Sequence, residues 1–430
     1  MLDIKYIREN IDEVKQGVKN KGAKINVDKI LDLDKQRRGL IQEIEELKAE
    51  KNKISKQRTM NNEQKKRAKK IKDEIKKFEP KLEKIEKEFN VLMLKIPNIP
   101  LDDVPVGKDE KDNLVLKNVG TRPKFNWKPK DYLEIAEKLD IIDIERAVKI
   151  AGSRFGYLKG GAALLEFALV QLAFDILTKE GFTPVVPPVM IKPEMATGMG
   201  YLEQTGDEEA YLIEKDNLYL IGTSEQAIGA MHANEIFQEN DLPKRYIAFS
   251  TCFRREAGSY GKDTKGILRV HQFDKAEMFS FCKPEDSKKE HKFLLSLQEE
   301  MMKLLKIPYR VVHLSSGDLS APSVSTYDIE SWMPGQPSVT ATERGEYRET
   351  HSTSNCTDFQ SRRLNIRYKK RTANNEQRTE FVHTLNGTAF AIGRTIIAII
   401  ENYQQKDGTV KVPKILQQYI GLKTITKTTN

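Results

Sequence analysis

The stretch from Phe253 to Phe281 carries side chains that could bind a phosphorylated nucleotide and an amine. It reads F-R-R-E, then a segment rich in Gly, Ser, Asp and Lys, then H-Q-F-D-K-A-E-M-F-S-F, which predicts a β-hairpin with a long loop. Arg254 and Glu256 are two residues apart and would share one face of the first strand, as Phe273 and Glu277 would on the second. Arg can fork onto a phosphate, Phe can stack on a base, and Glu can hold an ammonium group.

The alternative for the hairpin by itself is an ordinary charged sheet in which Arg and Glu pair across strands. Two of its segments, F-R-R-E and H-Q-F-D-K-A-E, resemble motif 2 of the class II aminoacyl-tRNA synthetases, in the form found in seryl-tRNA synthetases. The resemblance extends over nearly the whole chain. It implies an α+β fold, in which an antiparallel sheet flanked by helices is preceded by an N-terminal antiparallel coiled-coil arm.

Composition favours two domains and a polyanionic partner. The chain has 430 residues, of which 31% are charged, and a net charge of +9, although solubility alone would also explain that charge. Cys252, Cys282 and Cys356 have neither the spacing of a disulfide framework nor that of a zinc site. Because the N-terminus has no apolar signal segment, we expect a cytoplasmic protein without a membrane span.

Residues 1–100 show the apolar repeat of a coiled coil after a short opening helix over about residues 4–18. Two helices of about thirty residues each are expected to fold back on each other near Met60, with a kink at Pro80. A dimerisation coiled coil or spacer is the alternative. Basic side chains near the tip favour phosphate binding instead, and the resemblance implies a tRNA-binding arm; these side chains are Lys48, Lys51, Lys53, Lys56, Arg58, Lys65, Lys66, Arg67, Lys69 and Lys70.

A group of prolines ends the arm, residues 101–120 read as a surface linker, and residues 121–430 would form the catalytic domain. Residues 163–180 have the pattern of a strongly apolar helix. The segment F-T-P-V-V-P-P-V-M after it predicts a short buried strand at an edge or interface, since proline cannot donate to a central ladder. Helix and strand resemble motif 1, the dimer-interface element of the family, which implies a homodimer.

Two further segments carry oxygen-containing side chains. Y-L-I-G-T-S-E-Q places Thr223 at the start of a predicted helix, where it would also serve as a helix N-cap. Glu349 and Ser352 are three residues apart, and a carboxylate with a hydroxyl suits Mg²⁺. Such a pair is common by chance, but it lies in a segment that resembles E-x-x-S-x-S-N-C-T-D-F-Q-x-R-R of the family. The sequence departs from that pattern at Thr350 and His351, where we expect an aliphatic and a small residue.

The segment T-L-N-G-T-A-F-A-I-G-R joins a predicted strand to a helix that carries Arg394, and it resembles motif 3. An inward-facing Arg on an apolar helix needs an anionic partner. A carboxylate of the protein itself is one candidate. By the resemblance, the γ-phosphate of ATP is the other.

The resemblance implies two overlapping sets of ligands. The serine-binding set would be Thr223, Ser224, Glu225, Arg254, Glu277, Asn386 and Thr388. The ATP-binding set would be Arg254, Arg255, Glu256, Val270, Phe273, Glu349, Thr350, His351, Ser352 and Arg394. Arg254 and Arg394 would be the catalytic residues, at the α- and γ-phosphates, and Glu349 and Ser352 would hold Mg²⁺.

The activity implied is ATP-dependent ligation of L-serine to tRNA(Ser) through seryl-adenylate, and also serylation of tRNA(Sec) in hosts with a selenocysteine pathway. Two alternatives stay open. An amino acid to carrier-protein ligase would lack the basic arm, and a non-catalytic tRNA-binding paralogue would lose Arg254, Glu277 or Arg394. The arm and all three residues are present, which favours the synthetase.

Overall fold

The computed structural model describes residues 1–430 except for 57–60, 203–208, 258–264, 337–344, 372–376 and 428–430. The chain forms two compact units, Met1–Ile99 and Pro100–Asn430. The division falls among the prolines that predicted the end of the arm. Each unit has a hydrophobic core of its own, as expected of separately folded domains.

The first unit is built from helices, namely α1 (Ile4–Glu9), α2 (Ile11–Asn20), α3 (Val27–Ser55) and α4 (Asn62–Lys95). The prediction of a single opening helix is wrong, because the chain leaves helical geometry at Asn10 and then begins a second helix. Asp3 caps α1 and accepts a hydrogen bond from the backbone N–H of Lys5 at 2.7 Å.

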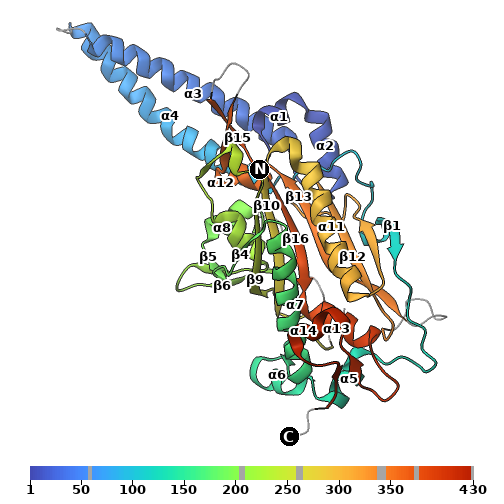
Figure 1. Cartoon of the computed structure of the whole chain (residues 1–430). Coiled ribbons are helices and arrows are strands. Elements are labelled where there is room, and N and C mark those ends of the chain that lie inside the picture. Colours follow the sequence, from blue (N-terminus) through green and yellow to red (C-terminus); the bar gives the residue numbers. More distant parts are fainter. Residues whose placement is uncertain (57–60, 203–208, 258–264, 337–344, 372–376, 428–430) are drawn as a thin grey trace. The chain divides into compact units, whose positions relative to one another are not determined.

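The predicted helical hairpin is confirmed, since α3 and α4 run side by side (Figure 1). Ile44 of α3 and Ile71 of α4 are buried along the seam. A capping box between Asn61 and Gln64 begins α4. The helix continues through Pro80, which is exposed, as its position on the outer side of the repeat predicted.

Some of the cations toward the tip are paired within the arm. Arg67 donates two hydrogen bonds to Glu50, at 2.7 and 2.6 Å, and Lys48 lies 3.4 Å from Glu79. Arg58 lies outside the described residues. The cations that remain exposed for an external partner are Lys53, Lys56, Lys65, Lys66, Lys69 and Lys70.

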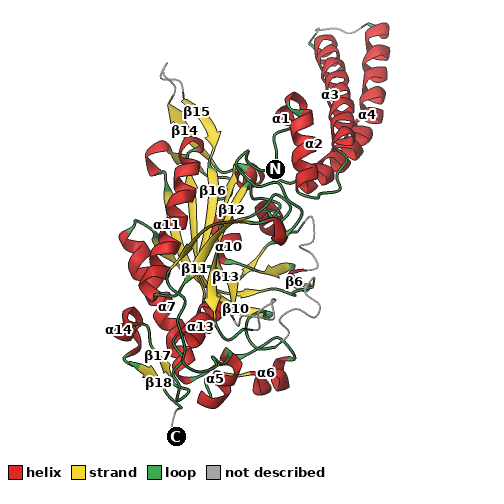
Figure 2. Ribbon diagram, turned by 90° about the vertical axis from the view of Figure 1, so that its right-hand side faces the viewer, coloured by secondary structure: helices red, strands yellow, loops and turns green. Residues whose placement is uncertain are grey.

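The second unit is organised around an eight-stranded sheet. From edge to edge the strands are β1 (Leu114–Val119), β11 (Tyr309–His313), β12 (Ser325–Met333), β13 (Glu346–Thr357), β16 (His383–Ala391), β10 (Gln272–Cys282), β9 (Lys244–Phe253) and β4 (Thr183–Val185). All neighbours are antiparallel except β4, which is parallel to β9. The predicted α+β fold with an antiparallel sheet is confirmed (Figure 2).

Helices cover both faces of this sheet. One face carries three longer helices, α7 (Gly160–Lys179), α11 (Ser287–Leu305) and α13 (Ile392–Asn402). The other carries three shorter ones, α8 (Pro193–Met199), α10 (Ser224–Ala230) and α12 (Phe359–Leu364). Because successive side chains of a strand point to opposite faces, Met278 of β10 joins the core under the longer helices, and Phe279 joins the core under the shorter ones.

Smaller elements complete the second unit. The other α-helices among the residues described are α5 (Tyr132–Leu139), α6 (Ile144–Ala151) and α14 (Gln417–Ile420). Two three-stranded sheets are formed by β5 (Met190–Ile191), β7 (Leu218–Leu220) and β6 (Tyr211–Ile213), and by β15 (Gln377–Phe381), β14 (Arg367–Arg371) and β8 (Ile236–Gln238). Two strand pairs are β2 (Ile142–Asp143) with β3 (Tyr157–Leu158), and β17 (Val410–Lys411) with β18 (Thr424–Ile425).

The stretch 101–120, which we predicted to be a surface linker, belongs to the second unit instead. Its strand β1 extends the large sheet by pairing with β11. Val104 is buried against Val312 and Leu314. The prediction was wrong because prolines and glycines mark turns equally within a folded domain and between domains.

The predicted apolar helix and proline-containing strand are α7 and β4. β4 lies at the edge of the sheet, as its proline predicted. It is not buried within one chain, however, because Pro184 is exposed and the following Val186 is 81% exposed. On α7, Leu164 and Phe167 are 44% and 67% exposed. Apolar surface therefore remains along both elements.

By length and composition, α7 is also apolar enough to cross a membrane, with a mean hydropathy of 1.6. It packs inside the folded unit instead. Leu165, Leu169 and Leu172 are buried in the main core. The helix is therefore a core element of the second unit.

We expect Phe281→Ala to lower the free energy of unfolding by about 3–5 kcal/mol, because it would leave a cavity among Phe237, Tyr246 and Phe279. Urea unfolding followed by near-ultraviolet circular dichroism measures the change. Val106→Ala is the matched control, since Val106 is 75% exposed. A loss as small as that of the control would contradict the assignment of this second core.

Candidate active site

The hairpin is formed by β9 and β10, which pair in register from Phe253 opposite Gln272. β9 ends at Phe253, so Arg254 and Glu256 follow the strand and do not share one of its faces; that part of the prediction is wrong. The backbone turns at Glu256, whose φ of 53° lies in the left-handed region. The backbone N–H of Arg254 donates to the carbonyl of His271 at 2.9 Å, which keeps the turn beside β10.

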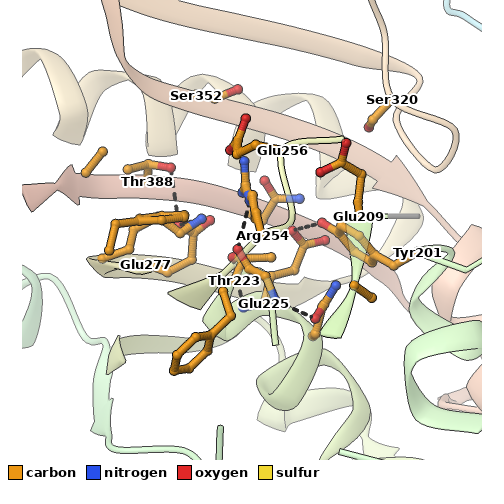
Figure 3. A pocket seen from close by; sticks show the side chains of 18 of the residues that line it. Tyr201, Glu209, Thr223, Glu225, Arg254, Glu256, Glu277, Ser320, Ser352 and Thr388 are labelled. Atoms are coloured by element: carbon orange, nitrogen blue, oxygen red, sulfur yellow. Dashed lines mark hydrogen bonds and ion pairs between the residues drawn. The ribbon is translucent and has the colours of Figure 1, made fainter. Parts of the chain in front are cut away.

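A cavity of about 700 Å³ opens beside this turn (Figure 3). Figure 3 shows Arg254 between two groups, with Glu277 and Thr388 on one side and Tyr201 and Glu209 on the other. The predicted residues that line it are Thr223, Glu225, Arg254, Glu256, Val270, Phe273, Glu277, Glu349, Thr350, Ser352, Asn386, Thr388 and Arg394.

The start of α10 forms one wall. The hydroxyl of Thr223 accepts a hydrogen bond from the backbone N–H of Glu225 at 3.3 Å, so Thr223 is an N-cap as well as a lining residue. Glu225 is 4% exposed. Its carboxylate oxygens accept hydrogen bonds from the hydroxyl of Tyr201 at 2.7 Å and from the amide of Gln360 at 2.9 Å. Both donors are neutral, so the carboxylate charge remains available to a polar or cationic ligand.

A second carboxylate, Glu277, lies on β10 beside Lys275. The Lys275 Nζ atom is 2.6 Å from Oε2 of Glu277, and the hydroxyl of Thr388 donates to the same oxygen at 3.2 Å. Burial raises the pKa of Glu277, the charge of Lys275 lowers it, and the like charge of Glu225 raises it again. The two carboxylates therefore interact, and a cation near both would be stabilised.

Glu349 and Ser352 both reach the cavity because β13 contains a bulge. In a regular strand, residues three apart point to opposite faces. The register of β12 with β13 shifts at this point, so that Thr350 is an extra residue that no residue of β12 faces in the register. The extra residue turns the Glu349 side chain to the same face as that of Ser352, and both line the cavity.

Asp328 of β12 adds a carboxylate that the sequence did not single out. It lies opposite Ser352 in the register and is hydrogen-bonded to it. Its Oδ1 atom is buried without a hydrogen-bond partner among the described residues. Burial and the charge of Glu349 raise the pKa of Asp328 well above its ordinary value. An unpartnered carboxylate oxygen beside a second carboxylate and a hydroxyl is a donor set that suits a hard divalent cation.

Two guanidinium groups reach the cavity from different elements. Arg394 of α13 donates to Oε2 of Glu349 at 2.9 Å, so a carboxylate of the protein is its partner in the free chain. Desolvation would raise the pKa of Glu349, but the charge of Arg394 outweighs it and holds that pKa below its ordinary value. Arg254 donates from Nε to the carbonyl of Gly222 at 3.1 Å, and its guanidinium lies 5.2 Å from the ring centroid of Phe273.

Three predicted residues do not line the cavity. Ser224 is buried and its hydroxyl is 2.7 Å from that of Ser250. Arg255 lies over the ring of Tyr211, 5.2 Å from its centroid. His351 is buried on β13, and burial lowers its pKa to about 4, so it is neutral near pH 7.

Sequence reasoning missed several residues of the site. Lys275 could have been found, because the alternation that selected Phe273 and Glu277 includes it. Gln360 lies in the segment that resembles the family motif, but nothing in that segment indicates that its amide contacts Glu225. Tyr201 carries no such signal, and its contact with Glu225 is seen only in the structure.

Comparisons with known proteins agree over the whole chain. Residues 1–100 match the family model "Seryl-tRNA synthetase N-terminal domain" and residues 211–403 match "tRNA synthetase class II core domain (G, H, P, S and T)". Proteins called serine–tRNA ligase are 46% identical in Dictyoglomus thermophilum, over 99% of each chain, and 43% identical in Thermodesulfovibrio yellowstonii, over 99% of this chain and 100% of that one.

Two solved structures are also similar. The seryl-tRNA synthetase of Pyrococcus horikoshii complexed with ATP has a TM-score of 0.91 and 40% identity, covering 100% of both chains. The cytoplasmic serine–tRNA ligase of Naegleria fowleri in complex with AMP has a TM-score of 0.87 and 36% identity, covering 100% of this chain and 99% of that one.

We expect Lys275→Met to lower the free energy of unfolding by about 3–5 kcal/mol near pH 7, because it leaves Glu277 buried without its cation. The pKa of Glu277 in the folded variant would rise further above its unfolded value. The folded state would then bind more protons than the unfolded one, so the deficit should shrink as the pH falls from 8 to 5.

Urea unfolding at several pH values measures this deficit. Lys130→Met is the matched control, because the side chains of Lys130 and Glu134 are 44% and 53% exposed in their pair. The control should cost less than about 1 kcal/mol. A Lys275→Met deficit that is the same at every pH would contradict the proposed role of the pair.

Proposed function

This chain belongs to the seryl-tRNA synthetase family of class II aminoacyl-tRNA synthetases, and we propose that its cavity carries out serine activation in the order usual for such ligases. The serine carboxylate attacks the α-phosphate of ATP, which forms seryl-adenylate and releases pyrophosphate. A ribose hydroxyl at the end of the tRNA then takes the seryl group and releases AMP. The observation that carries the proposal is one cavity that combines two guanidinium groups with two carboxylates suited to an amine.

The ATP half of the site would lie between Arg254 and Arg394. Arg254 has no carboxylate partner within the described parts of the chain, so its charge is available to the α-phosphate, where negative charge develops. Phe273 lies beneath that guanidinium and offers a face on which the adenine can stack. Arg394 would exchange its contact with Glu349 for the γ-phosphate. Catalysis then rests on positioning and charge neutralisation, without a general base.

Glu349 and Ser352, with Asp328 behind them, would hold Mg²⁺ through oxygen atoms. The bulge in β13 and the unpartnered oxygen of Asp328 support this assignment. When bound, the ion would neutralise phosphate charge. The protein's own contribution is to hold the two carboxylates and the hydroxyl on one face.

The serine half of the site would lie between Glu225 and Glu277. The two carboxylates can hold the ammonium group and the hydroxyl of serine, and Thr388 adds a hydroxyl that already contacts Glu277. An alanine in this site would leave these polar groups unpaired, which can supply discrimination of about 10⁴-fold or more. Threonine would be excluded by volume.

The arm, residues 1–100, would bind tRNA(Ser), and also tRNA(Sec) where a host makes it. The exposed lysines of α3 and α4 support this role, because phosphate contacts need free cations. They would read backbone and shape rather than base identity. Of the two alternatives, the carrier-protein ligase would have no need of such an arm, and the non-catalytic paralogue would have no need of Arg254 and Arg394 in one cavity.

We further propose a cytoplasmic homodimer. Phe167 of α7 and Val186 after β4 are 67% and 81% exposed, and apolar surface of this kind on a folded chain marks an interaction site. A second copy of the chain would cover it. The three cysteines are buried free thiols, which suits a reducing compartment.

Arg254→Ala should lower the rate of serine-dependent ATP–pyrophosphate exchange by about 10²–10³-fold, because it removes the charge placed at the α-phosphate. Assaying exchange across a panel of amino acids, with and without tRNA, measures both rate and substrate. Lys411→Ala, which removes an exposed cation of β17 outside the cavity, should leave the rate unchanged. Equal rates for the two variants would contradict the role of Arg254.

Deletion of about residues 40–80 should abolish tRNA charging and leave serine-dependent exchange intact, because the cavity lies wholly in the second unit. Charging of tRNA with labelled serine and ATP–pyrophosphate exchange measure the two activities separately. A milder variant replaces Lys65, Lys66, Lys69 and Lys70 by Ala and keeps the helices. Loss of exchange on deletion would contradict the assignment of serine activation to the second unit and of tRNA binding to the arm.

A further inference from the structure

Two buried side chains outside the cavity are linked to the carboxylate of Glu225. Gln360 lies on α12 and Thr384 lies on β16, and both are 0% exposed. Neither lines the cavity. The amide of Gln360 nevertheless donates to Oε1 of Glu225 at 2.9 Å, and the hydroxyl of Thr384 donates to Oε1 of Gln360 at 2.6 Å.

The orientation of the Gln360 amide is fixed by its surroundings. Its nitrogen donates to Glu225 and also to the carbonyl of Met199 at 3.2 Å. A flipped amide would bring its oxygen against both of these acceptors, and this fixes the orientation although the hydroxyl of Thr384 could itself donate to the carbonyl of Thr357 at 3.5 Å. Only one orientation of the amide satisfies Glu225, Met199, Thr384 and Gln360 together. The hydrogen bonds therefore run in one direction, from Thr384 to Gln360 and from Gln360 to Glu225.

The hydrogen bonds from Thr384 through Gln360 fix one oxygen of Glu225, and the hydroxyl of Tyr201 holds the other at 2.7 Å. A carboxylate with a donor on each oxygen cannot rotate without losing a charge-assisted hydrogen bond. The lone pairs of Glu225 that accept no hydrogen bond from Tyr201 or Gln360 therefore point in one fixed direction.

We propose that Gln360 and Thr384 are positioning residues that set the affinity for the amino acid by fixing Glu225. The proposal rests on the proposed role of Glu225 in binding serine. It predicts an effect confined to the amino-acid half of the site, because the contacts of Arg254 and Arg394 involve neither residue.

Steady-state ATP–pyrophosphate exchange on the purified full chain tests this. Gln360→Met keeps the volume and removes the donor, and it should raise the KM for serine by about tenfold or more while the KM for ATP is unchanged. Thr384→Val removes only the hydroxyl and should shift the serine KM in the same direction. Thr384→Ser keeps the hydroxyl and should restore the wild-type value.

Ser361→Ala is the matched structural control. Ser361 is the next residue on α12, is 0% exposed, and donates to the carbonyls of Asp358 and Val382. It should lower the melting temperature and leave both KM values unchanged. Should Gln360→Met fail to fold, the Thr384 pair carries the test.

Two results would overturn the inference. In one, Gln360→Met and Thr384→Val behave as Ser361→Ala does, with lower melting temperatures and an unchanged serine KM, so that the residues are structural only. In the other, the KM values for serine and ATP rise together, which would indicate a general distortion of the cavity. A wild-type chain without serine-dependent exchange would instead refute the proposed function itself.

Discussion

The site depends on places where the central sheet departs from regular pairing. A regular antiparallel ladder sends alternate side chains to opposite faces, but this cavity needs Glu349 and Ser352 on one face. The extra residue Thr350 resolves that conflict in β13. A second shift occurs between β10 and β16, where Glu277 faces Thr388 but the preceding residue faces Phe390. The sheet thus stays continuous, and two of its register shifts lie where the cavity opens.

These departures leave backbone groups that another element must satisfy. β13 and β16 pair from Thr353 and Gly387 onward, so Ser352 and Thr388 lie just beyond the ladder. Gln298 of α11, which is 0% exposed, donates to the carbonyls of both residues, at 2.8 and 2.9 Å. An unsatisfied buried carbonyl costs about 1–3 kcal/mol. A helix on the opposite face of the sheet therefore stabilises the opening that the cavity requires.

Most helices and strands of the two units, and most residues that line the cavity, could be predicted from the sequence. Hydrophobic periodicity and chemically distinctive motifs are local features of a sequence. The alternation of side chains was extended beyond Phe253, which placed Arg254 on the strand. In the structure the strand ends at Phe253 and the backbone turns at Glu256. Glu349 and Ser352 were selected by their spacing and by the resemblance of their segment to the family motif. The bulge that brings them to one face was not predicted, since a bulge has no sequence signature as clear as that of a turn. Gln360 lies in the segment that resembles the family motif, but the sequence assigns it no role. Its role follows only from a contact with Glu225, 135 residues away.

Charge balance explains why the free chain can hold so many ionised groups in one cavity. Lys275 compensates Glu277, and Arg394 compensates Glu349, so neither carboxylate is buried alone, which would be strongly destabilising. The two pairs differ in accessibility. The side chains of Lys275 and Glu277 are 9% and 2% exposed, but those of Arg394 and Glu349 are 27% and 48% exposed. The first pair is therefore enclosed at the wall of the cavity, and Lys275 keeps the charge of Glu277 compensated. The second pair can separate, and a phosphate would then take the guanidinium and leave the carboxylate free for a cation.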